Sequence, residues 1–151
     1  ESSSMGPVLV SNKVVSLHLH SCKIHEIEGG TFWGMKGLMY LYLSDNHLSS
    51  LDAKTFEGAH EIMYLHLEGN KLIRFPSSPS GLLSPLDVLH LEANALTEVP
   101  SDALGHAPLL SELRLSRNLI RWIGLRAFRV VAESLKHLHI DRMGLQKVEV
   151  K

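Results

Sequence analysis

The sequence predicts an α/β solenoid made of stacked repeats of 24 residues. Residues 38–51 read LMYLYLSDNHLSSL, with leucines at 38, 41, 43, 48 and 51 and an asparagine at 46. This is the L-x-x-L-x-L-x-x-N-x-L spacing of a leucine-rich repeat. Apolar alternation alone fits any half-buried strand, so the prediction depends on the fixed period and the fixed asparagine. We expect a right-handed superhelix with a concave parallel sheet and short irregular, 3-10 or helical convex segments.

The spacing divides the chain into a leader and a repeat domain. Residues 1–13 are predicted to be a flexible leader or the remnant of a preceding repeat, and residues 14–151 the leucine-rich repeat domain. The repeats span 14–37, 38–61, 62–85, 86–109 and 110–134, and a partial repeat spans 135–151.

Two repeats depart from the template. In the third, PSSPSGLLSP at 76–85 makes a regular helix unfavourable, and Leu82 and Leu83 are expected to fill the core. The fifth is one residue longer, and its segment LRAFRVVAES predicts a helical turn on the convex side.

The asparagines are predicted to form a structural ladder, because their amides can bond backbone groups where the chain leaves each strand. Cys22 and Met143 occupy the same position in the end repeats, and Cys22 is expected to be a small buried residue. The ladder consists of Asn46, Asn70, Asn94 and Asn118.

Composition and motifs argue against several classes of function. The 15 basic and 16 acidic side chains nearly cancel, so neither nucleic acid nor anionic lipid is an expected partner. No apolar run approaches the roughly 20 residues of a membrane span, so we expect no membrane insertion. The chain has no G-x-S-x-G, no H-E-x-x-H and no phosphate-binding glycine loop. We therefore predict a protein that is not an enzyme and needs no cofactor.

Side chains that flank the strand leucines should point away from the core and line the concave face. All three tyrosines of the chain fall at such positions, whereas all four phenylalanines fall at core positions. Tyrosine and histidine combine rigid apolar area with a polar tip, which favours protein binding. The predicted partner-binding residues are His18, Tyr40, Tyr42, Asp45, Tyr64, His66, Glu68, His90, Glu92, Arg114, Arg117 and His139.

Three other interpretations of this face remain open. Aromatic stacking could serve only to stabilise the sheet. His66, Glu68, His90 and Glu92 could in principle converge on a metal, although an open sheet rarely supplies the supporting groups, and we predict no metal site. Six of the ten histidines lie on this face, so binding is expected to weaken near about pH 5 to 6 if the imidazoles become charged and repel each other.

Charge is also predicted to change along the array. Asp45, Asp87 and the two glutamates of the face make the second to fourth repeats acidic, and Arg114, Arg117, Lys136 and Arg142 make the last two basic. Such a gradient would suit a bipolar partner, whereas solvated faces are the simpler explanation.

The segments VSLHLHSCKI, LMYLYLSDNHL, GLLSPLDVLHLEANAL and SLKHLHIDRMGL together resemble the chondroadherin-like group of the small leucine-rich repeat family of the extracellular matrix. The resemblance covers about residues 14–148. It implies a secreted matrix protein that binds collagen and supports cell attachment through integrins. The paired-cysteine caps and the basic tail of that family do not occur in this sequence, so their functions are not carried over. The competing hypothesis is an intracellular leucine-rich repeat scaffold or enzyme inhibitor that uses the same face.

Overall fold

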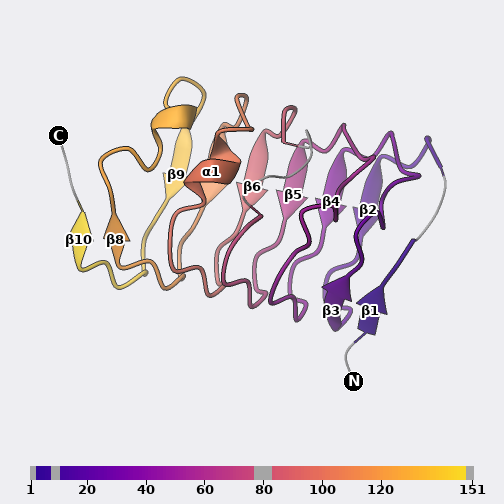
Figure 1. Ribbon diagram of the computed structural model, residues 1–151, viewed down its shortest axis with the longest axis horizontal. Helices are drawn as coiled ribbons and strands as arrows, with labels where there is room; N and C mark the ends of the chain where they lie inside the picture. Colours follow the sequence, from indigo (N-terminus) through magenta and orange to yellow (C-terminus); the bar gives the residue numbers. More distant parts are fainter. Residues whose placement is uncertain (1–2, 8–10, 77–82, 149–151) are drawn as a thin grey trace.

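A six-stranded parallel sheet forms one side of the molecule in the computed structural model, which describes residues 3–7, 11–76 and 83–148. Each repeat contributes one three-residue strand, and neighbouring strands come from consecutive repeats (Figure 1). The predicted fold class is therefore confirmed. The strands, in spatial order, are β2 (Ser16–His18), β4 (Tyr40–Tyr42), β5 (Tyr64–His66), β6 (Val88–His90), β7 (Glu112–Arg114) and β9 (His137–His139).

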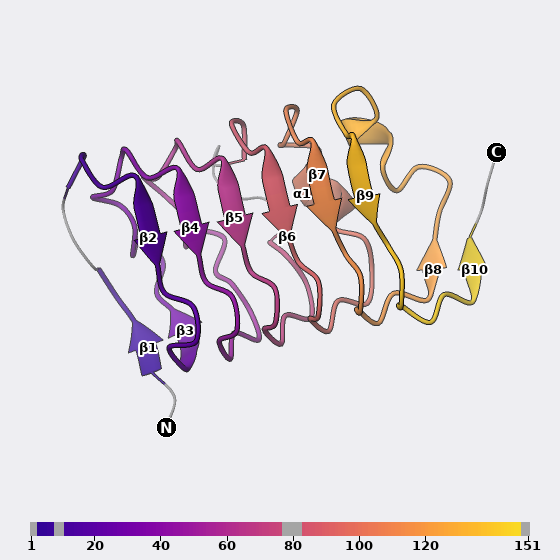
Figure 2. The ribbon, with the colours of Figure 1, turned by 180° about the vertical axis from the view of Figure 1, so that it is seen from behind.

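The opposite side consists mostly of irregular backbone. Near one end, β1 (Ser3–Met5) pairs in parallel with β3 (Ile24–Ile27), and near the other β8 (Trp122–Ile123) pairs with β10 (Lys147–Val148). The helix α1 (Ser101–Leu104) lies in front of the sheet in Figure 1, while Figure 2 shows the six strands in front. Among the described residues, no helix has the length and apolar character needed to span a membrane.

Two short helical segments occupy the convex side of the fourth and fifth repeats. The helical turn expected in the fifth repeat is present as the 3-10 helix η1 (Arg129–Val131). The helix α1, in the fourth repeat, was not predicted, because a single turn of four residues leaves no periodicity in the sequence. In the third repeat Leu83 is buried as expected, whereas Leu82 lies outside the described residues.

The core lies between the sheet and the irregular side. The central leucines of adjacent strands face each other in register, and Leu41, Leu65, Leu89 and Leu113 have no exposed surface. Phe32, Phe56 and Phe75 are also buried, and Phe128 packs against the core while partly exposed. Each repeat thus buries its apolar face against its neighbours, as stacked repeats require.

The asparagines connect each repeat to the one before it. Asn70 Nδ2 donates to the carbonyl oxygens of Leu43 and Leu67, both at 3.0 Å, and Asn70 Oδ1 accepts from the amide of Leu48 at 3.0 Å. Asn46, Asn94 and Asn118 make equivalent bonds. The four side chains are at most 9% exposed. Each amide therefore satisfies buried backbone groups of two repeats at once.

The residue before each asparagine of the ladder, and before Cys22 and Met143, has a left-handed backbone conformation that turns the chain out of the strand. Its φ is between 54° and 73° at Ser21, Asp45, Gly69, Ala93, Arg117 and Arg142. Glycine adopts this conformation without steric cost, and at Gly69 a side chain would also collide with the carboxylate of Asp45. The turns of adjacent repeats are therefore stacked closely at this point.

Cys22 is exposed, so its predicted burial is wrong. Its amide donates to Asn46 Oδ1 at 2.9 Å, and its thiol donates to the carbonyl oxygen of His20 at 3.3 Å. The neighbouring strand β2 is an edge strand of the six-stranded sheet, so a second repeat packs on one side of it only. Met143, at the corresponding position near the other end, is buried.

The ladder predicts the effect of Asn70→Ala. The substitution leaves the buried amide of Leu48 without a partner, and it removes one of the two amide donors from the carbonyl oxygen of Leu43, so the free energy of unfolding should fall by about 1–3 kcal/mol. Urea denaturation measures this change. As a control, Asn12→Ala at an exposed position should change stability by less than about 0.5 kcal/mol. Equal midpoints for the two variants would show that the ladder does not stabilise the array.

Candidate functional site

The concave face is the outer surface of the six-stranded sheet, and each strand presents its first and third side chains there. Eight of the predicted binding residues lie on these strands, and Glu68 and Glu92 follow β5 and β6 by two positions. Asp45 and Arg117 instead lie in the left-handed turns, at the margin of the face. The eight strand residues are His18, Tyr40, Tyr42, Tyr64, His66, His90, Arg114 and His139.

Aromatic rings stack across the first three strands of the sheet. Tyr40 and Tyr64 have ring centroids 4.6 Å apart and planes within 3° of parallel. In the adjacent column Tyr42 lies between His18, at 4.4 Å, and His66, at 4.7 Å. Parallel strands about 4.8 Å apart impose this spacing on side chains in register. The result is a surface of stacked rings that carries tyrosine hydroxyl groups and imidazole nitrogens.

A charged cluster follows the aromatic rings along the sheet. Glu68 Oε2 lies 3.4 Å from His66 Nδ1 and 3.9 Å from His90 Nδ1. His90 Nε2 lies 2.6 Å from Glu112 Oε2, and Arg114 Nε lies 3.2 Å from the same oxygen. The cluster therefore joins β5, β6 and β7 through alternating basic and acidic groups.

The protonation of the cluster follows from these contacts. Burial disfavours ionisation of Glu68, but hydrogen bonds from His66 and His90 outweigh it and lower the pKa of the carboxyl group to about 2. Burial also disfavours the charged form of His90, yet hydrogen bonds to Glu68 and Glu112 raise the pKa of its imidazole. The bond from His90 in turn lowers the pKa of Glu112. The carboxylates of Glu68 and Glu112 therefore favour the charged form of His90.

Charges on the face partly neutralise each other. Arg114 contacts Glu112 and also approaches Glu92, with 3.6 Å between Nη1 and Oε2. These contacts lie where the acidic repeats meet the basic ones. Arg142, farther along, is exposed and pairs with Asp141 at 3.9 Å. A bipolar partner would therefore meet paired charges near the centre of the face.

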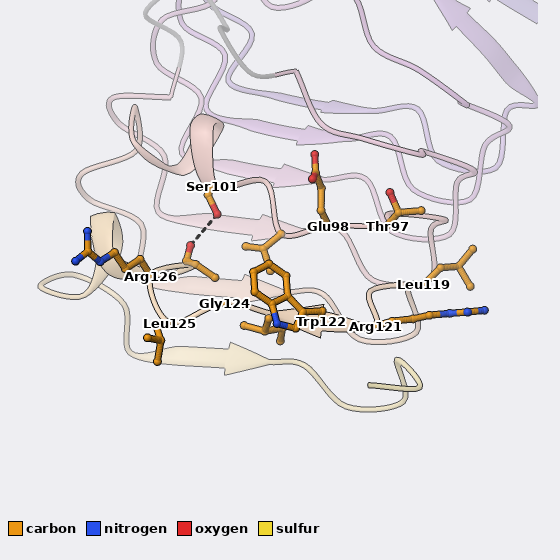
Figure 3. A pocket seen from close by; sticks show the side chains of 12 residues that line it. Thr97, Glu98, Ser101, Leu119, Arg121, Trp122, Gly124, Leu125 and Arg126 are labelled. Atoms are coloured by element: carbon orange, nitrogen blue, oxygen red, sulfur yellow. Dashed lines mark hydrogen bonds between the residues drawn. The ribbon is translucent and has the colours of Figure 1, made fainter. Parts of the chain in front are cut away.

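The convex side carries a groove that was not predicted from the sequence. It lies between the fourth and fifth repeats, has a volume of about 910 Å³, and is lined by Val99, Leu119, Trp122 and Leu125 among others (Figure 3). Leu119, Trp122 and Leu125 are each more than half exposed. These large apolar residues fall outside the leucine template. Their closeness in the sequence could have indicated an apolar surface on the convex side.

Comparisons with known proteins agree with the leucine-rich repeat fold. A model of the leucine rich repeat family matches residues 12–72. A chain from the structure of the Toll–Spatzle complex, a molecular hub in Drosophila development and innate immunity, is similar, with a TM-score of 0.83 and 27% identity. The match covers 99% of this chain and 19% of that chain. No match to a curated protein was found. The chain folds as a leucine-rich repeat solenoid, and the matches do not single out the matrix family that its sequence resembles.

The tyrosine stack predicts a measurable coupling. Tyr40→Ala and Tyr64→Ala each remove one ring of a pair in parallel contact, so a double-mutant cycle in urea should give a coupling energy of about 0.5–1.5 kcal/mol. Pairing Tyr64→Ala with the distant, exposed His106→Ala should give additive effects. A Tyr40–Tyr64 coupling no larger than that of the control pair would contradict the stack.

The carboxylate contact predicts the direction of a histidine titration. Glu112→Gln removes the negative charge 2.6 Å from His90 Nε2, so the pKa of His90 should fall. NMR titration in buffer containing a chelator measures it. Glu98→Gln, an exposed substitution outside the cluster, should leave the His90 titration unchanged. An unaltered His90 pKa in Glu112→Gln would show that the contact is not formed in solution.

Proposed function

We propose that this leucine-rich repeat module belongs to a secreted extracellular-matrix protein and that its concave face binds collagen. Cell attachment through integrins is the further role that the sequence resemblance implies. The observation that carries the proposal is the pair of aromatic columns on β2, β4 and β5, in which rings stack in register and remain accessible.

The aromatic columns suit the chemistry of a collagen triple helix. Its chains are rich in proline and adopt the polyproline II conformation, which is rigid before binding. Aromatic-lined surfaces recognise such segments in other proteins, because a flat ring packs against the proline ring. Tyr40, Tyr42 and Tyr64 supply such rings, and their hydroxyl groups can bond the carbonyl oxygens that a triple helix leaves exposed.

A second line of support concerns the kind of partner. The similar solved chain comes from a complex, Toll–Spatzle, and solenoid proteins use extended concave surfaces for binding. This favours a protein partner for the present chain as well. An intracellular scaffold or inhibitor would use the same face. A signal peptide and cysteine-rich caps in the flanking reading frame would distinguish the secreted protein from that alternative.

Solid-phase binding to fibrillar collagen tests the proposal. Tyr42→Ala removes the ring between His18 and His66, and we expect the dissociation constant to rise by about tenfold or more, as for a central aromatic anchor. His66→Ala should also weaken binding. Both variants are measured in buffer with a chelator, after circular dichroism has shown that they are folded.

The matched control is His106→Ala, an exposed histidine outside the concave face, which should bind like the parent. Parent-like binding by Tyr42→Ala and His66→Ala would place the collagen site on another surface. If the parent itself did not bind fibrillar collagen, the proposed partner would be wrong.

A further inference from the structure

Three potential metal ligands converge on the concave face where β5 and β6 adjoin. One ligand atom each from His66, Glu68 and His90 lies within 4.8 Å of the other two. The distances from Glu68 Oε2 are 3.4 Å to His66 Nδ1 and 3.9 Å to His90 Nδ1. Two donors bound to a tetrahedral zinc ion are about 3.4 Å apart, given Zn–N bonds of about 2.0–2.1 Å. Small rotamer adjustments would therefore place all three atoms around one ion.

A neighbouring carboxylate holds His90 in the orientation that a ligand needs. Glu112 Oε2 lies 2.6 Å from His90 Nε2, so a neutral His90 carries its hydrogen on Nε2 and donates it to Glu112. Its Nδ1 lone pair then faces the carboxylate of Glu68. Two electron-rich atoms in such a position repel each other unless a cation, either a proton or a metal ion, lies between them.

The remaining environment is consistent with an ion. The side chains of His66, Glu68 and His90 are 18%, 29% and 10% exposed, so the cluster is recessed yet reachable from solvent. Glu68 Oε1 is buried and has no hydrogen-bond partner. A carboxylate that turns toward a metal can use both of its oxygens.

We propose that His66, Glu68 and His90 form a zinc-binding site on the concave face, with Glu112 orienting His90. Two imidazole nitrogens and one carboxylate oxygen are a ligand set suited to zinc, whereas calcium and magnesium prefer oxygen ligands alone. Three protein ligands leave the fourth tetrahedral position to water or to a ligand atom of a partner. The site does not depend on the identity of that partner.

This proposal replaces the expectation, drawn from the sequence, that the face holds no metal site, and it differs from the possible ligand set considered there in two respects. The sequence suggested His66, Glu68, His90 and Glu92 as a possible set, but Glu92 is directed to Arg114 instead. A supporting carboxylate was also not expected from the sequence. Glu112 supplies one from the next strand, as in the carboxylate–histidine–zinc arrangement that orients metal ligands.

Isothermal titration of chelator-treated protein with zinc chloride tests the site. The parent should bind one zinc ion per chain, and His66→Gln or His90→Gln should weaken binding by about tenfold or more. Glu112→Gln keeps all three ligands and should weaken it by roughly 10–100-fold. Cobalt(II) provides a second readout, because a four-coordinate complex with the parent should show visible absorption bands that the ligand variants lack.

Two controls identify the site. His20→Gln alters an exposed histidine of the same face outside the cluster and should leave zinc affinity unchanged, and calcium chloride should give no stoichiometric binding. Zinc binding that survived in both His66→Gln and His90→Gln would overturn the proposal, as would a parent that bound no zinc. Circular dichroism establishes that each variant is folded, and the parent cobalt spectrum tests the site without any substitution.

Discussion

The hydrogen bonds of the buried asparagines hold neighbouring repeats in a single register. A buried amide that bonds backbone groups of two repeats can do so only when those repeats are in one register. A shift of one residue would leave polar groups unpaired in the core and would turn the strand leucines toward solvent. The leucines supply most of the apolar burial, but burial is non-directional, so the asparagines set the alignment.

Because the register is fixed, residues that recur once in each repeat line up as columns of side chains on the concave face. Residues 24 positions apart in the first five repeats become neighbours on parallel strands, so Tyr40 stacks on Tyr64 and His66 lies beside His90. The core leucines have little freedom to vary, whereas the outward columns are free to carry specific chemistry. In this chain they divide into aromatic rings on the early strands and a cluster of histidines, carboxylates and Arg114 on the later ones.

The period allowed the fold and the concave columns to be predicted from the sequence, because both depend only on which residues recur every 24 positions. Pairing within the cluster could not be predicted in the same way. Glu112 reaches His90 from the adjacent strand and an adjacent column, and that contact depends on rotamers rather than on spacing. The exposure of Cys22 depends on its place beside an edge strand, and α1 is too short to leave a periodic signal.

We propose that the concave columns, and not the convex side, contact the partner. Hydroxyl-radical footprinting of the chain bound to fibrillar collagen tests it most directly, because all three tyrosines lie on the concave face while Trp33 and Trp122 are exposed elsewhere. We expect Tyr40, Tyr42 and Tyr64 to lose labelling in the complex and both tryptophans to keep theirs. Protection of the tryptophans with unchanged tyrosines would contradict it.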